Sequence, residues 1–218
     1  MRITKDNINA YIKGKSMYCY NNEITHIDFI PEGITDIECW GNKLTKLPNL
    51  PESLEYLYCY NNKLTEMPKL PHFLKRLYCW NNYLTELPNI KYSSNYKLPH
   101  ALEELDCHNN KLTELPILTK RLVNLQCYNN KLTKLPKLPD NLKNLECDEN
   151  ELVSLPKLPH NLKHLYCHDN KLTKLPKLPE SLEHLSCNGN KLNYYPITND
   201  DFKEHNKFLK RKLILSKI

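Results

Sequence analysis

The sequence predicts a repeat solenoid built mainly of β-strands, and the first reason is a cysteine that returns at a fixed interval. Successive cysteines are twenty residues apart, except for one step of twenty-eight. They are Cys19, Cys39, Cys59, Cys79, Cys107, Cys127, Cys147, Cys167 and Cys187. The pattern LxxLxCxxNxLTxLPxLP surrounds them, as in "LEYLYCYNNKLTEMPKLP". A fixed period of this length is typical of stacked repeats, in which each unit forms one turn.

The run Leu-x-x-Leu-x-Cys predicts one short strand in each repeat. Leu57 and Cys59 are two positions apart, so they point to one face of a strand. Tyr56, Tyr58 and Tyr60 then point to the other face. A single unit cannot bury its apolar edge, but stacked units share a continuous core. We therefore expect a parallel concave sheet with one strand per turn.

An asparagine stands three residues after each cysteine, where the chain leaves the strand. A buried amide at this point can hydrogen-bond backbone groups of its own turn and of the neighbouring turn, which predicts a ladder of asparagines. The predicted ladder consists of Asn22, Asn42, Asn62, Asn82, Asn110, Asn130, Asn150, Asn170 and Asn190.

The Leu-Pro-x-Leu-Pro segment that returns the chain disfavours a helix. Proline removes a hydrogen-bond donor and biases the preceding residue toward extended geometry. The convex side should therefore be extended or polyproline-like. The predicted fold is a right-handed, curved horseshoe segment with short helical caps at both ends.

These motifs resemble the leucine-rich repeat family, over roughly residues 14–197. The twenty-residue Leu-Pro form is similar to the short repeats of secreted bacterial effectors of the YopM and IpaH type. The inward cysteine followed by "NNKLT" resembles leucine-rich repeat proteins of Mimivirus-like giant viruses. The resemblance implies a protein-binding module in a host–pathogen context. Effectors of the IpaH type carry a large carboxy-terminal ubiquitin ligase domain, but only about twenty residues follow the last repeat here, so that activity is not transferred.

The ends and one interruption define the expected domains. Residues 1–13 are expected to form an amino-terminal helical cap, 14–197 nine repeats, and 198–218 an amphipathic carboxy-terminal helical cap. An insertion near 90–98 should bulge on the convex or descending side without breaking the strand ladder. We interpret the insertion as uninvolved surface and the basic cluster at 207–212 as a solvated helix face. A contact role for either one is the alternative.

The repeated cysteines are predicted to be buried free thiols. Equivalent positions on adjacent strands lie about 4.8 Å apart, but their side chains run parallel. Their β-carbons therefore stay beyond the roughly 3.8 Å typical of a disulfide. Apolar surroundings also raise the pKa of a thiol, which makes it unreactive.

Histidines and carboxylates gather on the outward positions of the later repeats. They are His164, His168 and His184, with Glu146, Asp148 and Asp169 nearby. His164 and His168 are four residues apart on a strand, roughly 13 Å, which is too far for one ion. His164 and His184 on neighbouring strands remain close enough to share one. We favour a solvated polar face and predict no metal, cofactor or catalytic residue.

Aromatic residues dominate the outward positions of the first four repeats. Tyr, Trp and Arg often anchor protein interfaces, and broad exposed aromatic patches are rare without a use. The predicted partner-binding residues are Tyr18, Tyr20, Trp40, Tyr56, Tyr58, Tyr60, Arg76, Tyr78 and Trp80. The alternative is that tyrosine, a good strand former, spread with the repeat.

Composition sets the remaining expectations. The formal charge of +6 is spread along the chain, so it gives only weak support for a nucleic acid or membrane partner. No signal-peptide core or run of 18 apolar residues occurs, which predicts a cytoplasmic protein without a membrane span. We predict a non-enzymatic module that binds a protein partner and is a monomer or weak homo-oligomer. A metal-dependent or enzymatic activity and a structural or virion role are the alternatives.

Overall fold

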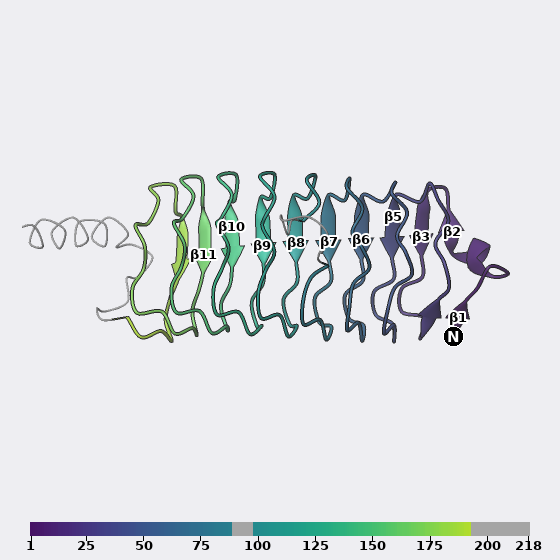
Figure 1. Ribbon diagram of the computed structural model, residues 1–218, viewed down its shortest axis with the longest axis horizontal. Helices are drawn as coiled ribbons and strands as arrows, with labels where there is room; N and C mark the ends of the chain where they lie inside the picture. The colour runs from purple at the N-terminus through teal and green to yellow at the C-terminus, as the bar shows by residue number, and fades with distance from the viewer. Residues whose placement is uncertain (89–97, 193–218) are drawn as a thin grey trace, which may run out of the picture.

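The chain winds into a solenoid whose strands lie side by side along its length (Figure 1). In this computed structural model the described residues are 1–88 and 98–192. The carboxy-terminal cap predicted for 198–218 lies outside them, as does almost all of the insertion predicted near 90–98. The division into domains therefore stays a prediction.

One parallel sheet runs through all the described turns. Its strands are β3 (Ser16–Tyr18), β5 (Asp36–Glu38), β6 (Tyr56–Tyr58), β7 (Arg76–Tyr78), β8 (Glu104–Asp106), β9 (Asn124–Gln126), β10 (Asn144–Glu146), β11 (His164–Tyr166) and β12 (His184–Ser186). A short strand β2 (Ile12–Lys13) pairs antiparallel with β3 at the amino-terminal edge. The predicted fold of a parallel β-solenoid with very little helix is confirmed.

The strands pair in register, so equivalent residues of successive repeats are neighbours. Leu57 of β6 pairs with Leu77 of β7, for example. Backbone pairing continues beyond the strands, where the Cys59 amide donates to the Tyr78 carbonyl at 2.9 Å. Leu57 and Cys59 are fully buried, as predicted for the inward face.

The core is a continuous column of leucine and cysteine. All nine cysteines are buried and unpaired, which confirms the prediction of free thiols. Burial raises the pKa of Cys19 to about 12, and it raises the pKa of Cys59 well above its ordinary range. These thiols stay protonated and are shielded from solvent, so they fill space in the core.

The asparagine ladder joins each turn to the preceding one. Asn62 donates from Nδ2 to the carbonyls of Cys39, Cys59 and Tyr60, and its Oδ1 accepts from the Leu44 amide. The same contacts recur at Asn82, Asn130, Asn150 and Asn170, among others. Each buried amide therefore satisfies backbone groups that the turn leaves without a partner.

The residue two positions after each cysteine has a positive φ. These residues are Asn21, Gly41, Asn61, Asn81, Asn109, Asn129, Glu149, Asp169 and Gly189. Asparagine, aspartate and glycine tolerate this left-handed geometry best. At Gly41 (φ +66°) a β-carbon would overlap the Oδ1 atom of Asn21 on the preceding turn. The sharp turn out of the strand explains why these residue types dominate the position.

The long repeat leaves the strand ladder intact, as predicted. β7 and β8 pair in parallel and in register, with Leu77 opposite Leu105. The Cys79 amide donates to the Asp106 carbonyl at 2.9 Å, as in repeats of ordinary length. The greater length of this repeat therefore does not displace the sheet.

The amino terminus differs from the helix expected over its first thirteen residues. It forms a strand β1 (Arg2–Ile3) and a single 3-10 turn η1 (Ile8–Tyr11). β1 pairs in parallel with β4 (His26–Ile27), which makes a second, two-stranded sheet. The side chain of Asn7 bonds backward, to the Thr4 amide and the Arg2 carbonyl. Because it does not cap η1, no longer helix begins there.

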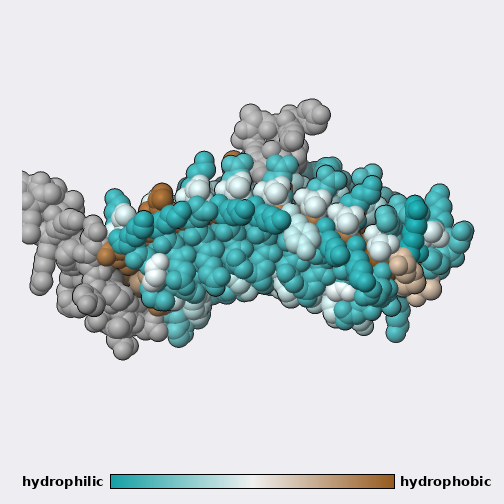
Figure 2. All heavy atoms as spheres, turned by 90° about the horizontal axis from the view of Figure 1, so that it is seen from below, coloured by the Kyte–Doolittle hydropathy of each residue, from teal (hydrophilic) through white to brown (hydrophobic). Residues whose placement is uncertain are grey.

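The outline of the molecule is arched, and the face seen in Figure 2 is predominantly hydrophilic. The described residues include no helix that combines the length and apolar character needed to cross a bilayer.

Candidate functional site: a ring ladder on the concave sheet

Six aromatic rings stack face to face along the sheet. They are the residues directly after six successive cysteines, here called the ring ladder: Tyr20, Trp40, Tyr60, Trp80, His108 and Tyr128. Ring centroids lie 4.6, 5.3, 4.4, 4.9 and 4.1 Å apart, and no pair of planes differs by more than 11°.

The spacing of the strands explains this stack. Neighbouring strands lie about 4.8 Å apart, and offset-stacked aromatic rings prefer centroid distances of about 4.5–7 Å. In-register pairing therefore brings equivalent rings into contact without any distortion of the chain. Each inner ring has both faces covered, so the ring ladder presents ring edges and not ring faces to a ligand.

Carboxylates anchor two of these edges. The indole Nε1 of Trp40 donates to Glu38 Oε2 at 3.3 Å. Nδ1 of His108 lies 2.5 Å from Asp106 Oδ1, and both residues are buried. The ring ladder is therefore held by stacking along the solenoid and by hydrogen bonds across each strand.

A second group of aromatic residues lies on the strands beside the ring ladder, here called the tyrosine cluster. The rings of Tyr58 and Tyr78 meet edge to face at 5.1 Å, and Arg76 lies over the ring of Tyr56 at 5.6 Å. Glu104 joins the group, because it accepts from the Tyr78 hydroxyl at 2.5 Å and pairs with Arg76 Nε at 3.2 Å. Burial and this hydrogen bond raise the pKa of Tyr78.

The structure places eight of the nine predicted partner-binding residues in these two sets. Tyr20, Trp40, Tyr60 and Trp80 belong to the ring ladder, and Tyr56, Tyr58, Arg76 and Tyr78 belong to the tyrosine cluster. Tyr18 is 42% exposed on β3, at the amino-terminal end of the sheet.

His108 and Tyr128 complete the ring ladder but were not among the predicted residues. Their position directly after a cysteine is the signal that assigns them to it.

The ring ladder ends at Tyr128, where acidic residues begin. Burial and the carboxylates of Asp106, Glu146 and Asp148 raise the pKa of Tyr128 to about 12. On the next turns, Asp148 and His168 occupy the position held by rings elsewhere. Burial also raises the pKa of Asp148.

The later histidines form two separate groups. His164 and His184 stack on each other, with ring centroids 4.8 Å apart. His168 instead faces Asp148, with 3.4 Å between Nε2 and Oδ2. Ligand atoms of Asp148, Glu149 and His168 lie within 4.8 Å of one another. His164 and His184 therefore lie together, as strand spacing suggested, but the group of three potential metal ligands includes neither of them.

A shallow depression lies at the centre of the sheet, between the tyrosine cluster and the acidic residues. Its volume is about 210 Å³. The lining residues are Tyr78, Glu104, Leu105, Asp106, Asn124, Gln126, Asn144 and Glu146. Carboxylates and amides dominate this lining, so it suits polar or cationic groups of a ligand.

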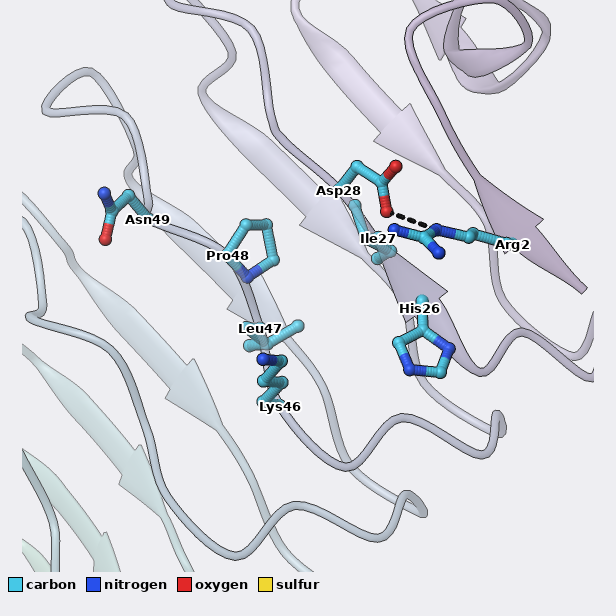
Figure 3. Close-up of a pocket in the computed structure, with 8 residues that line it drawn as sticks. All are labelled: Arg2, His26, Ile27, Asp28, Lys46, Leu47, Pro48 and Asn49. Carbon is cyan, nitrogen blue, oxygen red and sulfur yellow. Dashed lines mark hydrogen bonds and ion pairs between the residues drawn. The ribbon is translucent and has the colours of Figure 1, made fainter.

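A larger depression of about 730 Å³ lies beside the two-stranded sheet (Figure 3). One wall comes from β1 and β4, and the other comes from residues 46–49 of the next turn. Arg2 and Asp28 pair at 2.7 Å on the first wall, and their side chains remain 63% and 32% exposed. The charges of Arg2 and Asp28 neutralise each other, and the depression is open to solvent. We therefore do not consider it a candidate binding site.

Comparisons with known proteins agree with the repeat. Residues 73–120 match the family described as leucine rich repeats in two copies, and residues 161–185 match a single leucine rich repeat. No curated protein matches the chain in a sequence comparison.

Three solved structures are similar over most of the chain. YopM from Yersinia enterocolitica WA-314 has a TM-score of 0.78 and 32% identity, and the match covers 84% of this chain and 39% of that one. YopM from Yersinia pestis, described as a leucine-rich effector protein, has a TM-score of 0.71 and 33% identity, over 81% and 55%. The functional domain of InlJ from Listeria monocytogenes, described as including a cysteine ladder, has a TM-score of 0.70 and 31% identity, over 85% and 42%. The chain spans between about two fifths and just over half of these structures.

The fold and the outward-facing sheet define a class of repeat proteins that present a surface for binding. With the motif spacing and these matches, the chain is a leucine-rich repeat protein. The matched families describe the repeat itself and not an enzyme.

Proposed function

We propose that this chain is a non-enzymatic module that binds a protein partner on its concave sheet, through the ring ladder and the tyrosine cluster. The observation that carries the proposal is the gathering of eight predicted residues into two adjoining sets on one face. Tyrosine, tryptophan and arginine supply large contact areas with polar ends, which is the composition of interface anchors.

The orientation of the rings favours a polypeptide over a single-stranded nucleic acid. Nucleic acid binding of this kind depends on bases that stack on free aromatic faces. The inner rings of the ladder already cover each other's faces, while Trp40, Tyr60 and Trp80 stay partly exposed. The side chain of Arg76 is 44% exposed. Edges and hydroxyls suit the amides, carbonyls and apolar side chains of a protein surface.

The setting of this interaction is part of the proposal. Similarity to the leucine-rich effector YopM supports a partner in a host cell, and hence a place in the host cytoplasm. The resemblance to giant-virus repeats and the monomeric or weakly oligomeric state stay predictions. Solution mass measurement checks the oligomeric state.

The test uses two triple variants that lose side chains on different surfaces. The concave variant carries Tyr56→Ser, Tyr58→Ser and Arg76→Ser, which removes three side chains of the tyrosine cluster, keeps Tyr78 and leaves the ring ladder in place. The control variant carries Phe73→Ser, Ile117→Ser and Val153→Ser, which are exposed residues outside the sheet. Matched circular dichroism and thermal unfolding show that both variants fold.

The wild-type protein first captures partners from lysate of the natural host cell, and the affinity of the main partner is then measured for each variant. Interface anchors cost 2 kcal/mol or more when truncated, so the concave variant should lose roughly 100-fold or more in affinity. The control should change by less than about threefold. Equal loss in both variants, or loss in the control alone, rejects the concave face as the binding surface.

A further inference from the structure

Three potential metal ligands converge at the turns that follow the ring ladder. Nε2 of His168 lies 3.4 Å from Oδ2 of Asp148, and a carboxylate oxygen of Glu149 belongs to the same group. All three ligand atoms lie within 4.8 Å of one another. Ligands bound to one zinc ion at about 2.1 Å and tetrahedral angles are about 3.4 Å apart. The His168 to Asp148 distance therefore already fits a shared ion.

The carboxylate of Asp148 is the second observation that points to a cation. Its side chain is only 10% exposed. In the described part of the chain, its carboxylate has a hydrogen bond with the backbone of Asp148 itself and one ion-pair contact, to His168. A buried carboxylate without a firm cationic partner is costly, because burial removes its water.

Neighbouring residues add negative charge to the same place. Glu149 and Asp169 occupy the left-handed turn position that is asparagine in the four preceding turns. Oδ2 of Asp169 lies 3.9 Å from Nε2 of His168. Like charges on adjacent strands repel each other. Three carboxylates around one histidine therefore leave an excess of negative charge, which a divalent ion would neutralise.

The orientation of the His168 ring suits coordination. Nδ1 of His168 lies 3.3 Å from the hydroxyl of Ser186, so Nε2 is the nitrogen directed at the carboxylates. A hydrogen-bonding partner on the second ring nitrogen is usual for metal-binding histidines, because it fixes the orientation of the ring.

We propose that His168, Asp148 and Glu149 bind a zinc-type divalent ion, with Asp169 or a solvent molecule as the fourth ligand. An imidazole with carboxylates suits zinc, whereas calcium and magnesium prefer oxygen ligands alone. The ion joins residues of two successive turns. This inference is independent of the protein partner proposed above.

Elsewhere in residues 1–88 and 98–192, histidines beside carboxylates do not form such a group of three potential ligands. His108 is stacked between Trp80 and Tyr128, and its Nδ1 contacts Asp106 at 2.5 Å. His164 and His184 stack face to face, and Glu183 is the acidic residue that contacts His164, at 3.9 Å. The His164 and His184 pair therefore provides a matched control for nonspecific binding by surface histidines.

The test is titration calorimetry with zinc chloride on untagged, chelator-treated protein. The wild type should bind one zinc ion per chain, with magnesium and calcium at least roughly 100-fold weaker. His168→Gln or Asp148→Asn should weaken zinc binding by roughly 100-fold or more, since loss of an outer-shell partner alone costs 10–100-fold. The control His164→Gln with His184→Gln should leave the affinity unchanged.

Thermal unfolding provides a second readout. Zinc should raise the unfolding temperature of the wild type and of the control variant, because it binds the folded state. If His168→Gln does not fold, the double variant Glu149→Gln with Asp169→Asn decides, since both side chains are exposed. The proposal is overturned if the wild type binds no zinc, if binding survives the ligand substitutions, or if only the control variant loses it.

Discussion

The indole of Trp80 lies flat against the imidazole of His108, with centroids 4.9 Å apart and 11° between the planes, although the one long repeat separates them. This contact joins the first four rings of the ladder to the last two. It shows that the outward face of the sheet continues across the insertion. The two halves of the chain therefore present one surface.

His108→Ala should destabilise the protein more than most substitutions on the outward face of the sheet. The substitution removes both ring contacts and the imidazole partner of the buried Asp106 carboxylate, which within the described residues keeps only the long 3.4 Å bond from the backbone amide of residue 108. Stacked pairs contribute about 0.5–1.5 kcal/mol each and an unsatisfied buried group costs about 1–3, so we expect a loss of about 3 kcal/mol. Urea unfolding measures it. His184→Ala removes one stacking contact at an exposed position and should cost at most about 1 kcal/mol, and similar values for both would contradict the role assigned to His108.

The asparagine ladder should be most sensitive in its buried rungs. Asn62→Ala removes an amide that satisfies three carbonyls and one amide group of the backbone. We expect a loss of about 2–4 kcal/mol in the free energy of unfolding. Asn22 holds the same place in the first repeat, but it is exposed and donates to a single carbonyl, that of Tyr20. Asn22→Ala should cost less than half as much, and the reverse order would refute this explanation.

The cysteine column should make the protein sensitive to alkali. Burial raises the pKa of Cys19 to about 12 from an ordinary value of 9.0, and it raises the pKa of Cys39, Cys59 and Cys107 well above that value. Above pH 9 the unfolded thiols lose protons that the folded thiols keep. The free energy of unfolding therefore falls as pH rises, by about 1.4 kcal/mol per pH unit for each such thiol.

Urea unfolding between pH 7 and pH 10.5 measures this slope. A variant with Cys59→Ala and Cys107→Ala should show a shallower slope above pH 9, whatever its stability at pH 7. Equal slopes in the two proteins would mean that other groups, such as the half-buried Tyr60 and Tyr128, whose pKa is also raised, cause the alkaline loss. Below pH 8 the native wild type should also resist thiol reagents, which react with all nine cysteines after denaturation.

Gly41 and Gly14 separate backbone strain from steric overlap. Both have positive φ, +66° and +64°, but a β-carbon at Gly41 would overlap Asn21, whereas nothing lies within 4 Å of one at Gly14. Each alanine substitution should cost about 1 kcal/mol from the left-handed backbone. Gly41→Ala should cost about 1 kcal/mol more, visible as a lower unfolding temperature. Equal effects would show that the neighbouring asparagine moves aside freely.

The sequence predicts the fold well because every repeat carries the same spacing of apolar residues. Two-residue spacing places Leu57 and Cys59 inside, and the twenty-residue period makes Leu57 and Leu77 neighbours. The amino terminus was predicted poorly because it lies outside the repeats, where the pattern does not recur. Asn7 bonds back to Thr4 and Arg2, and sequence periodicity carries no information on such a local choice.

The candidate site was predicted in part. The face on which Trp40 and Tyr60 lie follows from strand alternation, but their parallel stacking follows from side-chain rotamers that the sequence does not specify. The grouping of Asp148 with His168 needed a comparison between turns, at equivalent positions twenty residues apart. Distances along one strand, such as that between His164 and His168, could not show it.

The intact register across the long repeat has a consequence for how such a chain changes length. Since every strand meets the next through the same bonds, whole turns can be duplicated or deleted and the two sides of the junction will still match. Growth within a single return arm is also accommodated, because β7 and β8 meet as if no extra residues separated them. The outward face of the sheet can thus be extended or shortened by gene duplication, one twenty-residue unit at a time, without redesign of the interior.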